Sequence, residues 1–232
     1  FFNDNAEIKP DRICLGVAGP VIKGKAEMTN LSWVLDSEEI RQATGVKEVS
    51  VINDLEATAY GLAGLTEKDM FTIHEGDSHN KGNIAIIAPG TGLGEAGLFW
   101  DGEFYHPFAT EGGHCDFAAR TEEDFELHQF LRKKTDVISW EHLVSGPGIF
   151  NIYQFLRDKK GVPEPPELKE ELAIEKDDTA VISKSATQDK YPICRQTMRL
   201  FVRYLAHESC NLVLKIKSTG GLYLGGGIPP KI

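Results

Sequence analysis

The chain contains the glycine-rich stretch Ala88-Pro89-Gly90-Thr91-Gly92-Leu93-Gly94, which continues an apolar run at residues 83–88 that predicts a buried strand. Glycines placed directly after a strand let main-chain N–H groups point at a phosphate, and the hydroxyl group of Thr91 adds a further donor. A tight turn that binds nothing would use the same residues. Local sequence therefore leaves a phosphate-binding loop and a simple turn both open.

A second nucleotide-binding interpretation overlaps this stretch. Residues 92–97 read Gly-Leu-Gly-Glu-Ala-Gly, which matches the glycine fingerprint of dinucleotide-binding proteins. That fingerprint requires a helix after the glycines. Asp101-Gly102 is instead typical of a two-residue turn between strands, which we predict at residues 95–100 and 103–106. The sequence therefore favours a glycine-rich hairpin over a nicotinamide-dependent dehydrogenase.

The amino-terminal part of the chain predicts the order strand, helix, strand. Strands are expected at residues 12–18 and 48–52, where apolar and β-branched side chains dominate. The helix between them is predicted to begin at Asp36-Ser37-Glu38-Glu39 and to end at Gly45.

Asn53 and Asp54 follow the second of these strands and precede a helical pattern in which Leu55, Ala59 and Leu62 share one face. A carboxylate in the first turn of a helix is kept ionised by the helix dipole and can accept a proton at neutral pH. Asp54 therefore fits a general base, although a helix N-cap uses the same residue types.

Two further polar clusters could bind hydroxyl groups. In Glu111-Gly112-Gly113-His114 the glycines remove steric bulk, so that both polar side chains can point at one ligand. Only Cys115 and Asp116 lie near enough to add metal ligands, which argues against zinc. Glu141 follows Trp140 and could hold a sugar hydroxyl group. The alternative for the first cluster is a polar loop in which the histidine makes its hydrogen bonds within the protein. The alternative for Glu141 is an ordinary surface residue.

The carboxyl-terminal part is predicted to be mainly helical. Apolar side chains recur at helical spacing over residues 121–132, 148–160 and 193–217. An apolar strand at residues 221–224 then leads into Gly225-Gly226-Gly227. A flat adenine ring could lie against this glycine backbone, but the triplet alone also fits a plain loop.

Composition narrows the class of protein. The 232 residues are 41% hydrophobic and 26% charged, with 23 glycines. A net charge of −10 disfavours binding to nucleic acid or an anionic membrane. The four cysteines show no CxxC pairing, so we expect neither disulfides nor a zinc cluster, and a reducing, cytoplasmic location. No apolar stretch approaches the roughly 18 residues of a membrane span.

Taken together and in order, these segments resemble the bacterial glucokinase family, the ATP-dependent hexokinases of the actin-like ATPase, or ribonuclease-H-like, superfamily. The resemblance is carried by Met28-Thr29-Asn30 followed by Trp33, Ile52-Asn53-Asp54, Gly90-Thr91-Gly92-Leu93-Gly94, Glu111-Gly112-Gly113-His114 followed by Asp116-Phe117-Ala118, Leu143-Val144-Ser145-Gly146-Pro147-Gly148 and Gly225-Gly226-Gly227-Ile228. The related ROK proteins place a cysteine-rich zinc motif after their histidine, and none follows His114. The resemblance is therefore to the non-ROK kind.

The resemblance implies an α/β protein with two domains, mixed β-sheets flanked by helices and a cleft between the domains. It also implies a division into residues 1–64 and 65–232. The implied reaction transfers the γ-phosphoryl group of ATP, with Mg²⁺, to the 6-hydroxyl group of glucose. The products are glucose 6-phosphate and ADP, and the reaction is the entry step of glycolysis. A homodimer is implied as well.

The resemblance also implies a role for each matching residue. Asp54 is the catalytic base, and no side chain is assigned to the metal. The glucose ligands would be Asn53, Asp54, Glu111, His114 and Glu141, with Asn30 supporting the sugar pocket. The nucleotide would be held by Gly90, Thr91, Gly92, Gly94, Gly225, Gly226 and Gly227.

Departures from the family pattern leave alternatives. The family opens with an Asp-x-Gly-Gly-Thr phosphate-binding hairpin and continues past its adenosine-side strand with further helices. Neither is found before Arg12 or after Ile232, so we expect the printed chain to be a fragment. A non-catalytic sugar-binding or regulatory protein of the same fold, or a kinase for another hexose, would fit the same motifs. Polyphosphate is an alternative phosphoryl donor.

Overall fold

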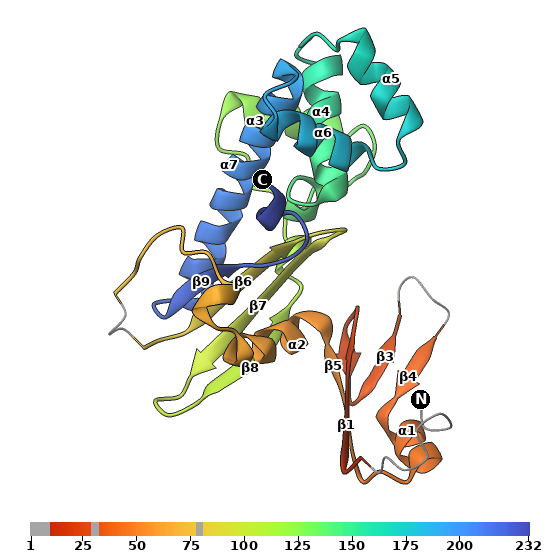
Figure 1. The fold of residues 1–232 in the computed structure, drawn as a ribbon, viewed down its shortest axis with the longest axis vertical. Helices are drawn as coiled ribbons and strands as arrows, with labels where there is room; N and C mark the ends of the chain where they lie inside the picture. Colours follow the sequence, from red (N-terminus) through yellow and green to blue (C-terminus); the bar gives the residue numbers. More distant parts are fainter. Residues whose placement is uncertain (1–9, 29–32, 78–80) are drawn as a thin grey trace. The chain divides into compact units, whose positions relative to one another are not determined.

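The computed structural model describes residues 10–28, 33–77 and 81–232 (Figure 1). The chain forms two compact units. The first contains the residues up to His74 together with Pro107–Ala109, and the second contains Glu75–His106 and Thr110–Ile232. The division after residue 64 that the resemblance implies stays a prediction.

The first unit is built on a parallel strand pair. β1 (Arg12–Val17) lies beside β5 (Glu48–Asn53), with Leu15 opposite Val51. α1 (Ser37–Thr44) precedes β5, as the sequence predicts. Asp36 caps this helix by accepting a hydrogen bond from the N–H of Glu38 at 2.9 Å, and Gly45 ends it in the left-handed conformation at φ 72°.

Three short strands in the first unit were missed by the sequence-based prediction. They form an antiparallel sheet in the order β2-β3-β4, with bounds Val21–Ile22, Lys25–Glu27 and Val34–Asp36. Runs of two or three residues are too short to show an alternating pattern. The buried side chains of Val17, Ala26 and Val51 form a small core in this unit. α2 (Asp54–Gly61) follows β5 and leads into the 3₁₀ turns Leu62–Gly64 and Glu67–Asp69.

The second unit contains a mixed four-stranded sheet. Its order is β8-β7-β6-β9, with bounds Tyr105–Thr110, Leu93–Trp100, Ile84–Pro89 and Gly221–Leu224. β6 is antiparallel to β7 and parallel to β9. A strand therefore follows the glycines at residues 90–94, and the dinucleotide-binding interpretation is excluded because it needs a helix there.

The turn between β7 and β8 differs from the prediction. It spans four residues, Asp101 to Phe104, rather than the two of Asp101-Gly102. The N–H of Asp101 donates to the carbonyl oxygen of Phe104 at 3.2 Å. The carboxylate of Asp101 accepts hydrogen bonds from the N–H groups of Glu103 and Phe104, both at 2.7 Å. These side-chain acceptors stabilise the longer turn.

Helices make up the rest of the second unit, and α7 runs from the helical group to the sheet beside β9 (Figure 1). The helices are α3 (Glu122–Leu131), α4 (Gly146–Asp158), α5 (Pro166–Ile174), α6 (Asp178–Thr187) and α7 (Pro192–Ile216), and 3₁₀ turns occur at Gly112–His114, Trp140–His142 and Pro229–Lys231. The sequence predicts α3, α4 and α7 but not α5 or α6. Among the described helices, α7 included, none has the length and apolar character needed to cross a bilayer.

The core of the second unit combines aliphatic side chains from β6, β7 and the helices with several large aromatic ones. Trp140, Tyr153, Phe155, Phe201 and Tyr204 are almost fully buried. Burial of such side chains contributes about 1.5–3 kcal/mol each.

Candidate active site

The glycine hairpin between β6 and β7 is pinned to the start of α4. The N–H of Gly90 donates to the carbonyl oxygen of Gly92 at 2.8 Å, which closes the turn, and Thr91 is exposed. The carbonyl oxygen of Gly90 in turn accepts a hydrogen bond from the N–H of Gly146 at 2.8 Å. Gly146 is the first residue of α4, so the hairpin lies beside a helix N-terminus, which favours anions.

The start of α4 is itself held by two hydroxyl groups. Ser145 donates to the carbonyl oxygen of Glu141 at 2.7 Å and accepts from the N–H of Gly148 at 3.1 Å, as an N-cap does. Thr179, from α6, donates to the carbonyl oxygen of Gly146 at 2.9 Å. The sequence predicts Ser145 only as part of a motif. It does not predict Thr179, because a contact across 33 residues leaves no local pattern.

The glycines after β9 lie against the same hairpin. The N–H of Gly225 donates to the carbonyl oxygen of Ile87 at 2.9 Å. Gly226 has φ 80°, and a Cβ atom there would collide with the main chain of Pro89. A Cβ atom on Gly90 would lie 4.0 Å from the main-chain nitrogen of Gly227. The two glycine segments that the sequence assigns to one nucleotide are therefore neighbours.

The loop that carries Glu111 and His114 is fixed from two sides. A Cβ atom on Gly113 would collide with the carbonyl oxygen of Leu93, so only glycine lets the loop lie this close to β7. On the other side, the N–H of Trp140 donates to the carbonyl oxygen of Cys115 at 3.0 Å. This arrangement places the loop next to the 3₁₀ turn that contains Glu141.

Glu111, His114 and Glu141 converge. Nε2 of His114 lies 3.8 Å from Oε2 of Glu111, and Nδ1 of His114 lies 3.9 Å from Oε1 of Glu141. Oε2 of Glu141 accepts a hydrogen bond from the N–H of Leu93 at 2.8 Å. The side chains of His114 and Glu111 are 62% and 60% exposed, so both are accessible to a ligand. Glu141 joins the predicted sugar loop to the predicted phosphate hairpin.

Asn53 and Asp54 occupy different positions at the start of α2. Oδ1 of Asn53 accepts from the N–H of Leu55 at 2.8 Å, and its Nδ2 donates to the carbonyl oxygen of Gly19 at 3.1 Å. Asn53 is therefore the N-cap. Asp54 is the first residue of the helix and is exposed, with Oδ1 3.0 Å from the N–H of Leu55. Because Asn53 caps α2, the carboxylate of Asp54 is not needed as the cap and stays accessible.

The remaining sequence-based expectations concern Asn30, a metal site and the cysteines. Asn30 lies outside the described residues. Within the described ranges, no group of three or more histidine, cysteine or acidic side chains could hold a metal ion. The four cysteines are free thiols.

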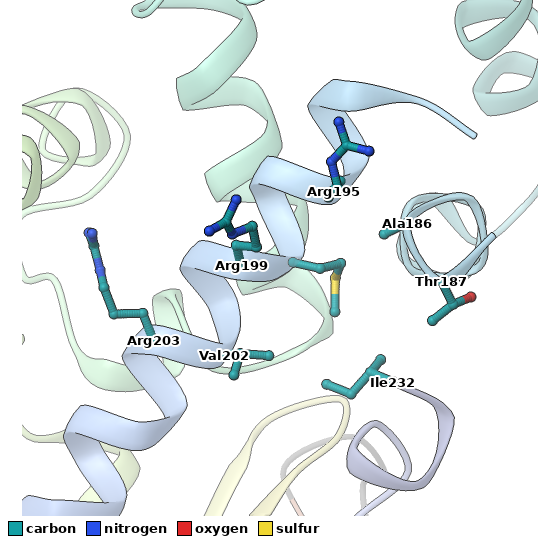
Figure 2. A pocket seen from close by; sticks show the side chains of 8 residues that line it. Ala186, Thr187, Arg195, Arg199, Val202, Arg203 and Ile232 are labelled. Carbon is teal, nitrogen blue, oxygen red and sulfur yellow. The ribbon is translucent and has the colours of Figure 1, made fainter. Parts of the chain in front are cut away.

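A cavity of about 520 Å³ lies away from all the predicted site residues, between α6, α7 and Ile232. Arg195, Arg199 and Arg203 line it from one face of α7 (Figure 2). Two of these arginines have acidic partners: Arg195 pairs with Asp189, and Arg203 pairs with Asp124.

Comparison with known proteins gives one consistent answer. The family model described as Glucokinase matches residues 1–232. A glucokinase of Trichormus variabilis is 41% identical over 240 residues, which cover 98% of this chain and 70% of the relative. A solved glucokinase from an Antarctic psychrotroph is 34% identical, with a TM-score of 0.81 over 99% of this chain and 68% of that one.

A solved glucokinase from Balamuthia mandrillaris, in complex with glucose, is similar in fold. Its TM-score is 0.76 at 24% identity, over 97% of this chain and 66% of that chain. These similarities confirm the predicted α/β sugar kinase fold of the actin-like ATPase superfamily, and they are consistent with the non-ROK type. The chain belongs to the glucokinase family.

Proposed function

We propose that this protein phosphorylates the 6-hydroxyl group of glucose with ATP and releases glucose 6-phosphate and ADP, as the entry step of glycolysis. The observation that carries the proposal is the double contact of Glu141, which faces His114 at 3.9 Å and accepts from the N–H of Leu93 at 2.8 Å. A single carboxylate thereby links the side chains proposed to hold the sugar to the hairpin proposed to hold the phosphates.

Asp54 is the proposed general base. Its exposed carboxylate would take the proton of the sugar 6-hydroxyl group as the oxygen attacks the γ-phosphorus atom. Asn53 is proposed to contact the sugar as well. Its oxygen already accepts from Leu55 and one of its N–H groups donates to Gly19, so its second N–H group is the donor left for a hydroxyl group. This fixed side chain would orient the carboxylate next to it.

Glu111, His114 and Glu141 are the proposed hydroxyl ligands. Together they offer four carboxylate oxygens and an imidazole, which suits adjacent hydroxyl groups that can both donate and accept. A hexose that lacks one of these hydroxyl groups would leave a polar partner unpaired, at a cost of about 1–3 kcal/mol. This cost is the proposed source of the preference for glucose over other hexoses.

The nucleotide is proposed to lie along the two glycine segments. The N–H groups of Gly90 and Leu93 already have partners, so the proposed phosphate donors are the remaining N–H groups of residues 90–94. The first N–H groups of α4 are also paired, so this helix would contribute only the positive end of its dipole. Gly225, Gly226 and Gly227 are proposed to lie beside the adenosine. Gly227 leaves room for it, because a Cβ atom there would meet nothing within 4 Å, whereas Gly225 and Gly226 let the segment pack against β6. Mg²⁺ would enter with the phosphates of ATP and neutralise their charge, and we assign no side chain to it.

We also propose a cytoplasmic location and a homodimer. The four free thiols suit a reducing compartment. Sedimentation equilibrium tests the homodimer.

A coupled assay of ADP release with a panel of hexoses and phosphoryl donors tests the function. We expect turnover with glucose and ATP, and at least about tenfold lower kcat/KM for hexoses that differ at one hydroxyl group. Turnover with polyphosphate in place of ATP would contradict the nucleotide assignment. Glucose binding by calorimetry without any turnover would support the sugar-binding alternative.

A further inference from the structure

A pair of buried carboxyl groups lies directly beneath the loop that carries Glu111 and His114. Glu95, on β7, is 1% exposed, and Glu208, on α7, is fully buried. A Cβ atom on Gly112 would collide with the carboxyl group of Glu95, so this group touches the underside of the loop. The main chain of Glu95 is tied to the same loop, because Thr110 donates to its carbonyl oxygen at 3.3 Å and accepts from the N–H of Gly112 at 3.1 Å.

The two carboxyl groups have too few donors for two charges. Oε1 of Glu208 pairs with Lys215 at 3.2 Å, and its Oε2 accepts from Asn211 at 2.7 Å. Among the described residues, Oε1 of Glu95 has no hydrogen-bond partner. A hydrogen bond between the carboxyl groups of Glu95 and Glu208 is among the causes that raise the pKa of Glu95. Two ionised carboxylates can only accept, so that bond requires a proton on one of them.

The surroundings of Glu95 favour its protonated form. Glu208 and Lys215, both from α7, are the charged groups that act on it within the described residues, while β6 places Ile87 opposite and the loop contributes Gly112 and Thr110. Burial first, and then the charge of Glu208, raise the pKa of Glu95 to about 7, against the opposing charge of Lys215.

We propose that Glu95 and Glu208 share one proton and thereby act as positioning residues for the sugar loop. With the proton in place, one carboxyl group is neutral and donates a hydrogen bond to the other, whose negative charge Lys215 balances. Gly112 packs against this pair. Loss of the proton sets two buried charges against each other. The loop is the neighbour that can move to admit water, since the other sides of the pair are β6 and α7.

The consequence for the site rests on the proposed function. If Glu111 and His114 hold glucose, affinity for glucose must fall as the pair loses its proton above about pH 7, because the loop is then less ordered. Glu95→Gln should remove this dependence. The amide of glutamine donates to Glu208 at every pH and so imitates the protonated acid.

Amide hydrogen exchange of residues 110–116, corrected for intrinsic rates, tests the pair without any ligand. In the wild type we expect protection of this loop to fall on the order of tenfold between about pH 6 and pH 8.5. In Glu95→Gln this loop should stay protected at both pH values. Glu103→Gln, an exposed carboxylate beyond the end of the same strand, should follow the wild type.

Glucose affinity, measured by calorimetry over the same range, should weaken in parallel in the wild type and in Glu103→Gln but not in Glu95→Gln. Protection that is independent of pH in the wild type, or that falls equally in Glu95→Gln, would overturn the proposal. If Glu95→Gln does not fold, Glu208→Gln takes its place in the exchange measurement. The pH dependence of loop protection in the wild type then tests the proposal together with this variant. Absent glucose binding, with the exchange pattern intact, would refute the sugar assignment and leave the carboxyl pair standing.

Discussion

Oε2 of Glu141 accepts a hydrogen bond from the main-chain N–H of Leu93 at 2.8 Å, across 48 residues of sequence. Gly92 makes this contact possible, because a Cβ atom there would lie 2.5 Å from the same oxygen. The other carboxylate oxygen, Oε1, faces His114. One side chain therefore ties the orientation of the histidine to the start of β7.

Replacing Glu141 should separate its charge from its role as an acceptor. Glu141→Gln keeps an oxygen for the N–H of Leu93 but loses the charge that faces His114. Hydrogen bonds to charged groups contribute about 1.5–3 kcal/mol, so KM for glucose should rise by about 10- to 100-fold. Steady-state kinetics measure this rise, and Glu103→Gln serves as the control. An unchanged KM would remove Glu141 from the sugar site.

Gly226 and Gly227 should respond differently to alanine. At Gly226, φ is 80° and a Cβ atom would meet the main chain of Pro89, so Gly226→Ala should destabilise the protein by about 1–3 kcal/mol. At Gly227 nothing lies within 4 Å, so Gly227→Ala should leave the thermal unfolding midpoint close to that of the wild type. Differential scanning calorimetry separates the two variants, and equal unfolding midpoints would contradict the local geometry.

The same Gly227→Ala variant probes the nucleotide assignment. A methyl group in open space beside Gly90 would occupy part of the volume proposed for the adenosine. KM for ATP should therefore rise by about fivefold or more, while KM for glucose stays unchanged. If the two Michaelis constants move together, or neither moves, the adenosine does not lie at this position.

Asp124 should govern stability at acidic pH. It is almost fully buried and accepts from the N–H groups of Arg120 and Thr121, from Arg203 and from the hydroxyl group of Tyr204. Burial alone would raise its pKa, but these hydrogen bonds outweigh burial and lower the pKa below its ordinary value of 3.8. The stability that Asp124 contributes is therefore present above about pH 4 and is lost as the pH falls further.

Urea unfolding of Asp124→Asn checks this dependence. The variant should lose about 2–3 kcal/mol near pH 7, and the difference from the wild type should shrink toward about pH 3. Glu122→Gln, an exposed change on the same helix, should match the wild type throughout. A difference that does not depend on pH would show that Asp124 acts through packing instead of charge.

Local signals account for the elements that the sequence predicted. Asp36 and Gly45 mark both ends of α1, and Thr121 with Asp124 forms a capping box at the start of α3. α5 and α6 also begin with local signals, Pro166 in the first turn of α5 and the N-cap Asp177 of α6, but each buries few side chains, among them Leu168 and Ile182, so the apolar pattern is weak. Their stability comes from packing in the folded unit, which periodicity cannot show.

The candidate site was predictable only in part. Glycine clusters and polar motifs could be read as separate pieces, but their convergence depends on contacts between segments far apart in the chain, such as Glu141 with Leu93. Glu95 carried an overlooked signal, since a lone carboxylate within an apolar strand must find a partner or a proton. Glu208, one turn after Tyr204 on the buried face of α7, is the matching signal.

Asp54 is the proposed base for phosphoryl transfer to glucose. Its direct test is Asp54→Ala, assayed for glucose-dependent ADP release and, by calorimetry, for glucose binding, with Asp11→Asn as an exposed control. We predict that turnover disappears while the glucose dissociation constant stays within about tenfold of the wild-type value, because the other ligands remain. Turnover that survives in Asp54→Ala would contradict the account.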